Sequence, residues 1–190
     1  GGPDWRAMTS APPRWDLSPY FSGLDDRRLH DSLEEVGAEI GRLRALCDAH
    51  DVRAGDPRPV TDADGETIER VVQTLEAITT RARVVGAFLH ARTTTDARDD
   101  EAARLSLALQ STNAPLGPLL KRIEGWVARL GSDALAATGP VAADHAFWLR
   151  RAERLASHQM TEAEEGLAAE MGLTGGRAWA RLHSEVTATL

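Results

Sequence analysis

The sequence is poor in several features that whole classes of protein require. Its single cysteine, Cys47, excludes an internal disulfide and suits a reducing compartment. No apolar run approaches the roughly 18 residues that a membrane span requires, and residues 1–13 lack the apolar segment of a signal peptide. The formal net charge is −7, and the 22 basic residues form no patch of the kind that nucleic-acid binding needs. We therefore expect a cytoplasmic protein whose partners include neither nucleic acid nor membrane.

Motifs for catalysis and for metal binding are also missing. The chain has six histidines: His30, His50, His90, His145, His158 and His183. None has a second histidine four residues away, as the His-Glu-x-x-His helix of zinc peptidases requires, and none has the acidic residue three positions earlier that a di-iron bundle uses. A Gly-x-Ser-x-Gly nucleophile turn and a phosphate-binding loop are absent as well. We therefore predict no catalytic, cofactor-binding or metal-binding residue in this chain.

Helical periodicity, in contrast, runs through most of the chain. Apolar residues recur at spacings of three and four, as in the run Leu29, Leu33, Val36, Ile40, Leu43 and Leu46. The same pattern predicts helices over residues 25–50, 61–92, 99–130 and 141–157, with a short helical turn at 132–137. No useful length alternates as a strand would. We therefore predict an all-α protein, a bundle of long antiparallel helices joined by short loops, with an extended N-terminal arm.

Three local features add detail to this pattern. The run Thr93–Thr95 is expected to end the second helix, because β-branched residues are poor helix formers. Pro115 and Pro118 predict a break near Asn113, since each proline lacks an amide donor and crowds the preceding turn. Cys47 lies beside the first apolar stripe and is expected to be a small core residue.

The sequence predicts two parts of unequal length. Residues 1–22 are rich in proline and glycine and are expected to form an extended arm, partly disordered, that packs on the body through Trp15, Leu17 and Tyr20. Residues 23–190 are expected to form one helical lobe. Within it, the helix over 141–157 is expected to carry four apolar residues on or near one side: Phe147, Trp148, Leu149 and Leu155.

Residues 158–190 have the signals of two consecutive helices. Thr161 and Glu164 have the spacing of a capping box, and Gly172 stands where a glycine would end a helix. Thr174 can then cap a second helix, which carries Trp179. We expect Trp179 to be largely buried against the helix over 141–157.

This stretch resembles the segment of the oligoendopeptidase F family, the thimet-oligopeptidase-like zinc peptidases, that leads into their catalytic domain. The family pattern is a histidine, an aliphatic residue, Ser or Thr, acidic residues, a glycine-containing turn and Ala-Trp-x-x-Leu. The matching residues are His158, Met160, Thr161, Glu164, Glu165, Gly176, Ala178, Trp179 and Leu182. A second match, Trp15-Asp16-Leu17 with Tyr20, extends the resemblance over nearly the whole chain. Met160 departs from the usual leucine, and the middle of the chain matches only as a pattern of helices.

The resemblance implies a non-catalytic N-terminal lobe of an oligoendopeptidase F-like zinc metallopeptidase. In the full-length enzyme, zinc would belong to a catalytic domain of the same polypeptide that this chain does not contain. The lobe would form one wall of a channel for short peptide substrates. Because part of its surface would pack on the catalytic domain, an exposed apolar patch is expected at Val186 and Leu190, covered in the isolated fragment by a second copy in a homodimer.

Other interpretations stay open beside this one. The main alternative is a stand-alone helical adaptor or regulator that binds a protein partner through a groove. An enzyme in its own right is a third class, although no reacting constellation is visible. Two roles are also open for His158, which either contacts a peptide substrate or the catalytic lobe, or orients the helix turn before Thr161.

Overall fold

The computed structural model describes residues 16–96, 98–158, 164, 167–168, 171–172 and 175–187. Within these residues every regular element is an α-helix and no strand occurs, which confirms the predicted all-α class. None of the described helices is both long and apolar enough to cross a membrane. The chain folds as two compact units: unit 1 comprises Gly1–Leu46 and Gln73–Pro118, and unit 2 comprises Cys47–Val72 and Leu119–Leu190. The predicted boundary between an arm over 1–22 and a lobe over 23–190 stays a prediction.

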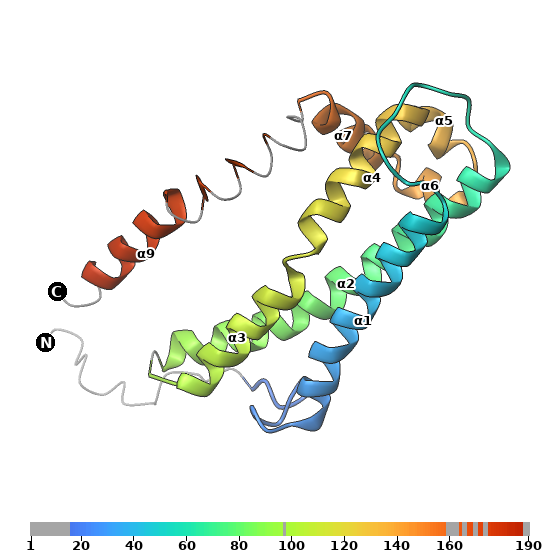
Figure 1. The fold of residues 1–190 in the computed structure, drawn as a ribbon. Helices are drawn as coiled ribbons and strands as arrows, with labels where there is room; N and C mark the ends of the chain where they lie inside the picture. Colours follow the sequence, from blue (N-terminus) through green and yellow to red (C-terminus); the bar gives the residue numbers. More distant parts are fainter. Residues whose placement is uncertain are drawn as a thin grey trace, which may run out of the picture. The chain divides into compact units, whose positions relative to one another are not determined.

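Unit 1 is an antiparallel arrangement of three helices, α1 (Arg27–Ala49), α2 (Asp62–Thr95) and α3 (Asp100–Asn113), of which α1 and α2 extend into unit 2 (Figure 1). Their facing apolar stripes meet in a core that includes Leu29, Phe88 and Leu105. The rings of Phe21 and Phe88 lie edge to face with centroids 5.1 Å apart. The helical spacing of three and four therefore placed the core residues of this unit correctly.

Aspartates fix the starts of α1 and α3. The carboxylate of Asp26 accepts the backbone amides of Ser22 at 2.7 Å and Arg28 at 2.9 Å, and that of Asp99 accepts the amide of Ala102 at 3.0 Å. These bonds satisfy donors that a helix start leaves unpaired. The Arg28 guanidinium and the Ser22 amide hold the pKa of Asp26 well below its usual range. The predicted starts of these two helices, near residues 25 and 99, are confirmed.

The prediction that α2 ends near Arg92 is wrong, because the helix continues through Thr95. Each threonine hydroxyl of the run donates back to a carbonyl one turn earlier: Thr94 to His90 at 2.8 Å and Thr95 to Ala91 at 2.8 Å. These bonds give the hydroxyls partners inside the helix, in a threonine rotamer that helical backbone geometry allows.

At the start of unit 1, the aromatic residue that is buried is not the one that the sequence predicted. Leu17 is half-buried against the core, but Tyr20 is 58% exposed and Phe21, at 6%, is the aromatic ring that packs inward. The carbonyl of Leu17 accepts the amides of Tyr20 at 3.0 Å and Phe21 at 3.2 Å, so a tight turn rotates Tyr20 outward. Trp15 lies outside the described residues.

Unit 2 is built on α4 (Leu116–Leu130), which follows α3 after the break predicted near Asn113. Its Ile123 and Trp126 side chains are completely buried, as is Cys47. The loop before α2 lies along α4: Arg122 Nε donates to the Val52 carbonyl at 3.2 Å, and Arg129 Nε donates to the Asp56 carbonyl at 3.2 Å. Both arginines thus hold an irregular segment whose backbone carbonyls would otherwise lack partners.

Three shorter helices, α5 (Ser132–Ala136), α6 (Pro140–Asp144) and α7 (Ala146–Ala156), pack on one another in unit 2, and α9 (Gly176–Thr187) follows. The predicted single helix over 141–157 is therefore interrupted. At His145 the backbone turns away from helical geometry (φ −99°, ψ 14°), and the Val141 carbonyl has two neighbours there, the His145 amide at 3.2 Å and the ring Nδ1 at 2.8 Å. The side chain thus shares this carbonyl with the backbone amide, and such a local bond favours a turn over a continuous helix.

Candidate functional site

Helices α5 and α7 are joined by two polar contacts that fix their mutual orientation. Glu153 of α7 points inward, where its carboxylate accepts a very short hydrogen bond from the Ser132 hydroxyl and the Ser132 amide at 3.3 Å. Arg150 donates to Asp133 at 3.0 Å. Both acids of this pair of helices are thereby engaged, which leaves the remaining arginines of α7 without them.

The outer face of α7 combines an aromatic ring with positive charge. Phe147, Arg151, Arg154 and His158 follow one another at spacings of four, three and four, which places them on one side of the helix and of the turn after it. All four are exposed, and Phe147 is 75% exposed. The prediction that Phe147 belongs to the apolar side is wrong: Leu149 and Ala152 are the buried residues, and they lie opposite.

Helix α9 carries an exposed apolar face. Trp179, Leu182 and Val186, again at spacings of three and four, are 71%, 48% and 51% exposed. Leu167 and Met171, in the segment before it, are exposed as well. The expected burial of Trp179 is therefore wrong, and the expected exposure of Val186 is confirmed. The helical spacing places these three large apolar side chains on one face of α9, and this face is exposed to solvent.

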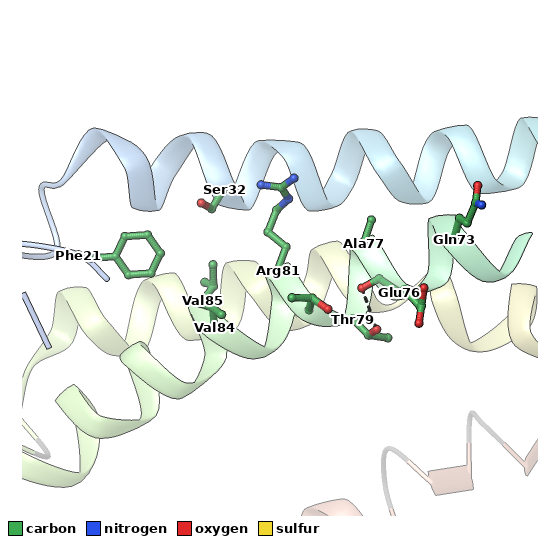
Figure 2. A pocket seen from close by; sticks show the side chains of 10 residues that line it. Phe21, Ser32, Gln73, Glu76, Ala77, Thr79, Arg81, Val84 and Val85 are labelled. Atoms are coloured by element: carbon green, nitrogen blue, oxygen red, sulfur yellow. Dashed lines mark hydrogen bonds between the residues drawn. The ribbon is translucent and has the colours of Figure 1, made fainter. Parts of the chain in front are cut away.

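Unit 1 contains an open groove of about 800 Å³ along α1 and α2 (Figure 2). Phe21, Val84 and Val85 line one end, and Arg81 reaches from α2 toward α1 beside Ser32. The lining mixes apolar, hydroxyl and charged side chains, so the groove is not an apolar cavity of the kind that encloses a small ligand.

The guanidinium of Arg81 forms a partly buried ion pair with Glu39. Its Nη2 is 3.3 Å from Oε1 of Glu39, whose side chain is 9% exposed, and Arg42 approaches the same oxygen at 3.8 Å. The Arg81 Nε and Glu39 Oε2 atoms are buried without a hydrogen-bond partner. Part of the hydrogen-bonding capacity of both groups is therefore unused. We assign this ion pair a structural role, which is to hold α1 and α2 together, and not a catalytic one.

A second hollow, of about 630 Å³, lies in unit 2 between the start of α2 and the turn from α5 to α6. Asp62, Glu66 and Glu69 line it from one face of α2. Asp64, at the same helix start, turns inward, where Arg58 binds both of its oxygens at 2.7 Å and the Thr61 amide donates at 2.9 Å. The Arg58 guanidinium lowers the pKa of Asp64 well below its usual range.

The six histidines are dispersed. The ring of His30 bonds the Leu24 carbonyl at 2.9 Å, that of His50 lies 3.4 Å from Arg70, and His145 contacts Val141 as described. His90, His158 and His183 are exposed. Within the described ranges, no three His, Cys, Asp or Glu side chains come close enough to hold a metal ion.

A family model described as oligopeptidase F matches residues 132–190. These residues are therefore similar to the N-terminal domain of the oligopeptidase F family. The match covers less than half of the chain, and the similarity around Trp15 lies outside it. No curated protein and no solved structure matches the chain. An N-terminal domain of this family implies a catalytic domain in the same polypeptide.

The family-matched segment, residues 132–190, contains α5, α6, α7 and α9, and therefore both exposed faces described above. Of the motif that carried the resemblance, Met160, Thr161 and Glu165 lie outside the described residues, as does Thr174. Gly172 is helical, and the positive φ among the described glycines belongs to Gly131, at 86°. The expected stop at Gly172 is therefore wrong.

Sequence reasoning missed the exposed face of α7 within the family-matched segment. The signal was present, since Phe147, Arg151 and Arg154 already have helical spacing in the sequence. It was obscured because Phe147, Trp148 and Leu149 are consecutive, and consecutive apolar residues do not say which of them faces the core. The exposed face of α9 is a second feature, for which the sequence predicted the exposure of Val186 but not that of Trp179.

Proposed function

We propose that this chain is the non-catalytic N-terminal lobe of an oligopeptidase F-like zinc metallopeptidase, and that it forms one wall of the channel that admits short peptide substrates. The match of residues 132–190 to the family carries this proposal. Zinc and the residues that bind it would belong to the catalytic domain of the same polypeptide.

The exposed face of α9 supports the proposal in a second way. A soluble monomer rarely leaves a contiguous apolar patch of several large side chains in water. Trp179, Leu182 and Val186 lie inside the family-matched segment, and in the proposed arrangement a surface common to the family covers them. The catalytic domain is such a feature. A homodimer of the chain through the same face is the arrangement that we propose when that domain is absent.

The decisive experiment compares this chain with the polypeptide that its complete gene encodes. The 190-residue chain alone should bind no stoichiometric zinc and cleave no quenched-fluorescence peptide. The complete polypeptide should bind one zinc and cleave short peptides in the cytoplasmic pH range. Turnover with a tightly bound zinc in the purified 190-residue chain would contradict the division between lobe and catalytic domain.

The position of α9 is tested in the same pair of proteins. Leu182→Glu and Val186→Glu place charges on the apolar face without removing a buried side chain. In the complete polypeptide they should lower peptidase activity and raise susceptibility to proteolysis near the domain boundary. In the 190-residue chain, sedimentation velocity should show that they abolish self-association. A parent chain that stays monomeric at every concentration would refute the homodimer, and it would favour the alternative of a stand-alone adaptor if the complete gene encodes no further domain.

A further inference from the structure

The outer face of α7 has a composition that resembles a protein interaction surface. Arginine and aromatic residues are enriched at the energetically important centres of interfaces. Here Phe147, Arg151 and Arg154 stand side by side on one helix face, with His158 just beyond it. The exposed Phe147, at the N-terminal end of this charged face, contributes nothing to the core, which Leu149 and Ala152 supply from the opposite side.

The charges of this face are not neutralised locally. Asp133 is occupied by Arg150, and Glu153 is turned toward Ser132. Arg151 and Arg154 form no ion pair in the part of the chain that the structure describes. Two guanidinium groups, each a planar fork of donors suited to a carboxylate, are therefore presented to solvent on a protein whose net charge is −7.

We propose that this face of α7 binds an acidic peptide segment, with Arg151 and Arg154 pairing with carboxylates and Phe147 contacting an apolar side chain. The inference deepens the proposed function, on which it rests for the assumption that the chain meets peptides. The inference adds a preference for acidic peptides, about which the family match says nothing.

The size of the face limits the ligand. Phe147 and His158 are eleven residues apart, which corresponds to roughly 16 Å along a helix. An extended peptide covers about 3.3 Å per residue, so about five residues span the face. A nucleic acid fits less well, because its closely spaced phosphates would meet the acidic remainder of the chain.

Fluorescence anisotropy with labelled hexapeptides tests the proposal on the 190-residue chain. The probes are a peptide of leucine and glutamate and a second in which lysine replaces each glutamate. The acidic peptide should bind, and its affinity should fall when the ionic strength rises from about 20 to about 500 mM, where the Debye length shortens to about 4 Å. The lysine peptide should not bind measurably.

Three variants assign the binding to this face. Arg151→Glu and Arg154→Glu should each raise the Kd about fivefold, since each replaces an exposed attraction by a repulsion. Phe147→Ala should weaken binding at both ionic strengths, because its contact is apolar. Arg83→Glu on the exposed surface of α2 makes the same charge change in unit 1 and should leave the Kd unchanged. All four side chains are exposed, so the melting temperature should not move.

Several outcomes would overturn the inference. These are equal binding of the two peptides, an equal loss of affinity in Arg83→Glu, or tighter binding of a labelled RNA oligonucleotide than of the acidic peptide. These results leave the proposed function standing, because zinc content and turnover of the complete polypeptide are measured separately. Acidic-peptide binding by the chain together with a complete polypeptide that lacks zinc would instead sink the proposed function and keep the surface.

Discussion

Gly125 is the residue at which a single methyl group should disturb unit 2 most clearly. It lies in the buried side of α4, directly under the loop that precedes α2. A Cβ at this position would stand 2.8 Å from the Cβ of Ala54 and 3.3 Å from its Cα and N. Two of these three atoms are backbone, so Gly125→Ala forces the loop itself to move rather than a flexible side chain.

The magnitude follows from two opposing terms. Replacing glycine by alanine inside a helix is worth about 1 kcal/mol in favour of the variant. Overpacking costs about 1–3 kcal/mol. Movement of the loop also strains the bonds from Arg122 to Val52 and from Arg129 to Asp56, and a hydrogen bond to a charged group contributes about 1.5–3 kcal/mol. We expect Gly125→Ala to destabilise the chain by about 2 kcal/mol, which lowers Tm by about 4–8 °C for a domain of this size.

Thermal unfolding followed by circular dichroism measures this shift, and a matched variant isolates its cause. Gly41 lies on α1 with nothing within 4 Å of an added Cβ, so Gly41→Ala should raise the stability by up to about 1 kcal/mol. Ala54→Gly in the Gly125→Ala background removes the closest contact and should restore part of the loss. A Gly125→Ala protein that melts at or above the parent temperature would refute the steric argument.

Three further predictions concern other residues. Because its partners lower the pKa of Asp64, its ionised form stabilises the fold above the ordinary aspartate pKa of about 4, and this stabilisation is lost as the pH falls through the lowered value; Asp64→Asn should therefore lower Tm at pH 7, and urea titrations should show the difference from the parent shrinking below about pH 4. At concentrations where the 190-residue chain is monomeric, Trp179→Ala should change its unfolding free energy by less than about 0.5 kcal/mol, since the ring is exposed, and a loss of several kcal/mol would show that the helix packs on the body after all. Burial raises the pKa of the Cys47 thiol, so Ellman's reagent should modify it only on unfolding, whereas rapid reaction of the native chain would contradict its burial.

The sequence was sufficient for those features that depend on periodicity. The apolar spacing located α1 and the core residues along it, and it identified Cys47 as a buried residue of the same helix. The break near Asn113 was also predictable, because a proline cannot donate the hydrogen bond that would continue the helix. Pro118 is tolerated in the first turn of α4, where the missing donor has no helical partner.

The errors arise where side chains compete for the same role or bond back to the backbone. Tyr20 and Phe21 are adjacent, and only the turn at Leu17 decides which ring reaches the core. The threonines at the end of α2 would end a helix by propensity alone, yet their hydroxyls bond the preceding turn. Trp179 shows a different failure: a large aromatic residue with helical spacing predicts an apolar face, but it does not say what covers that face.

The two exposed faces of the family-matched segment differ in chemistry, and this difference has consequences for their roles. Interfaces that stay closed permanently are the more apolar ones, whereas interfaces that form and separate carry more charge. The face of α9, with Trp179, Leu182 and Val186, has the first composition, and that of α7, with Phe147 one turn before Arg151 and Arg154, has the second. Salt distinguishes them, because screening weakens pairs of charges and leaves apolar burial intact. We therefore expect raised ionic strength to release an acidic peptide from α7 while any association through α9 persists, and loss of both at the same salt concentration would show that the two faces act as one surface.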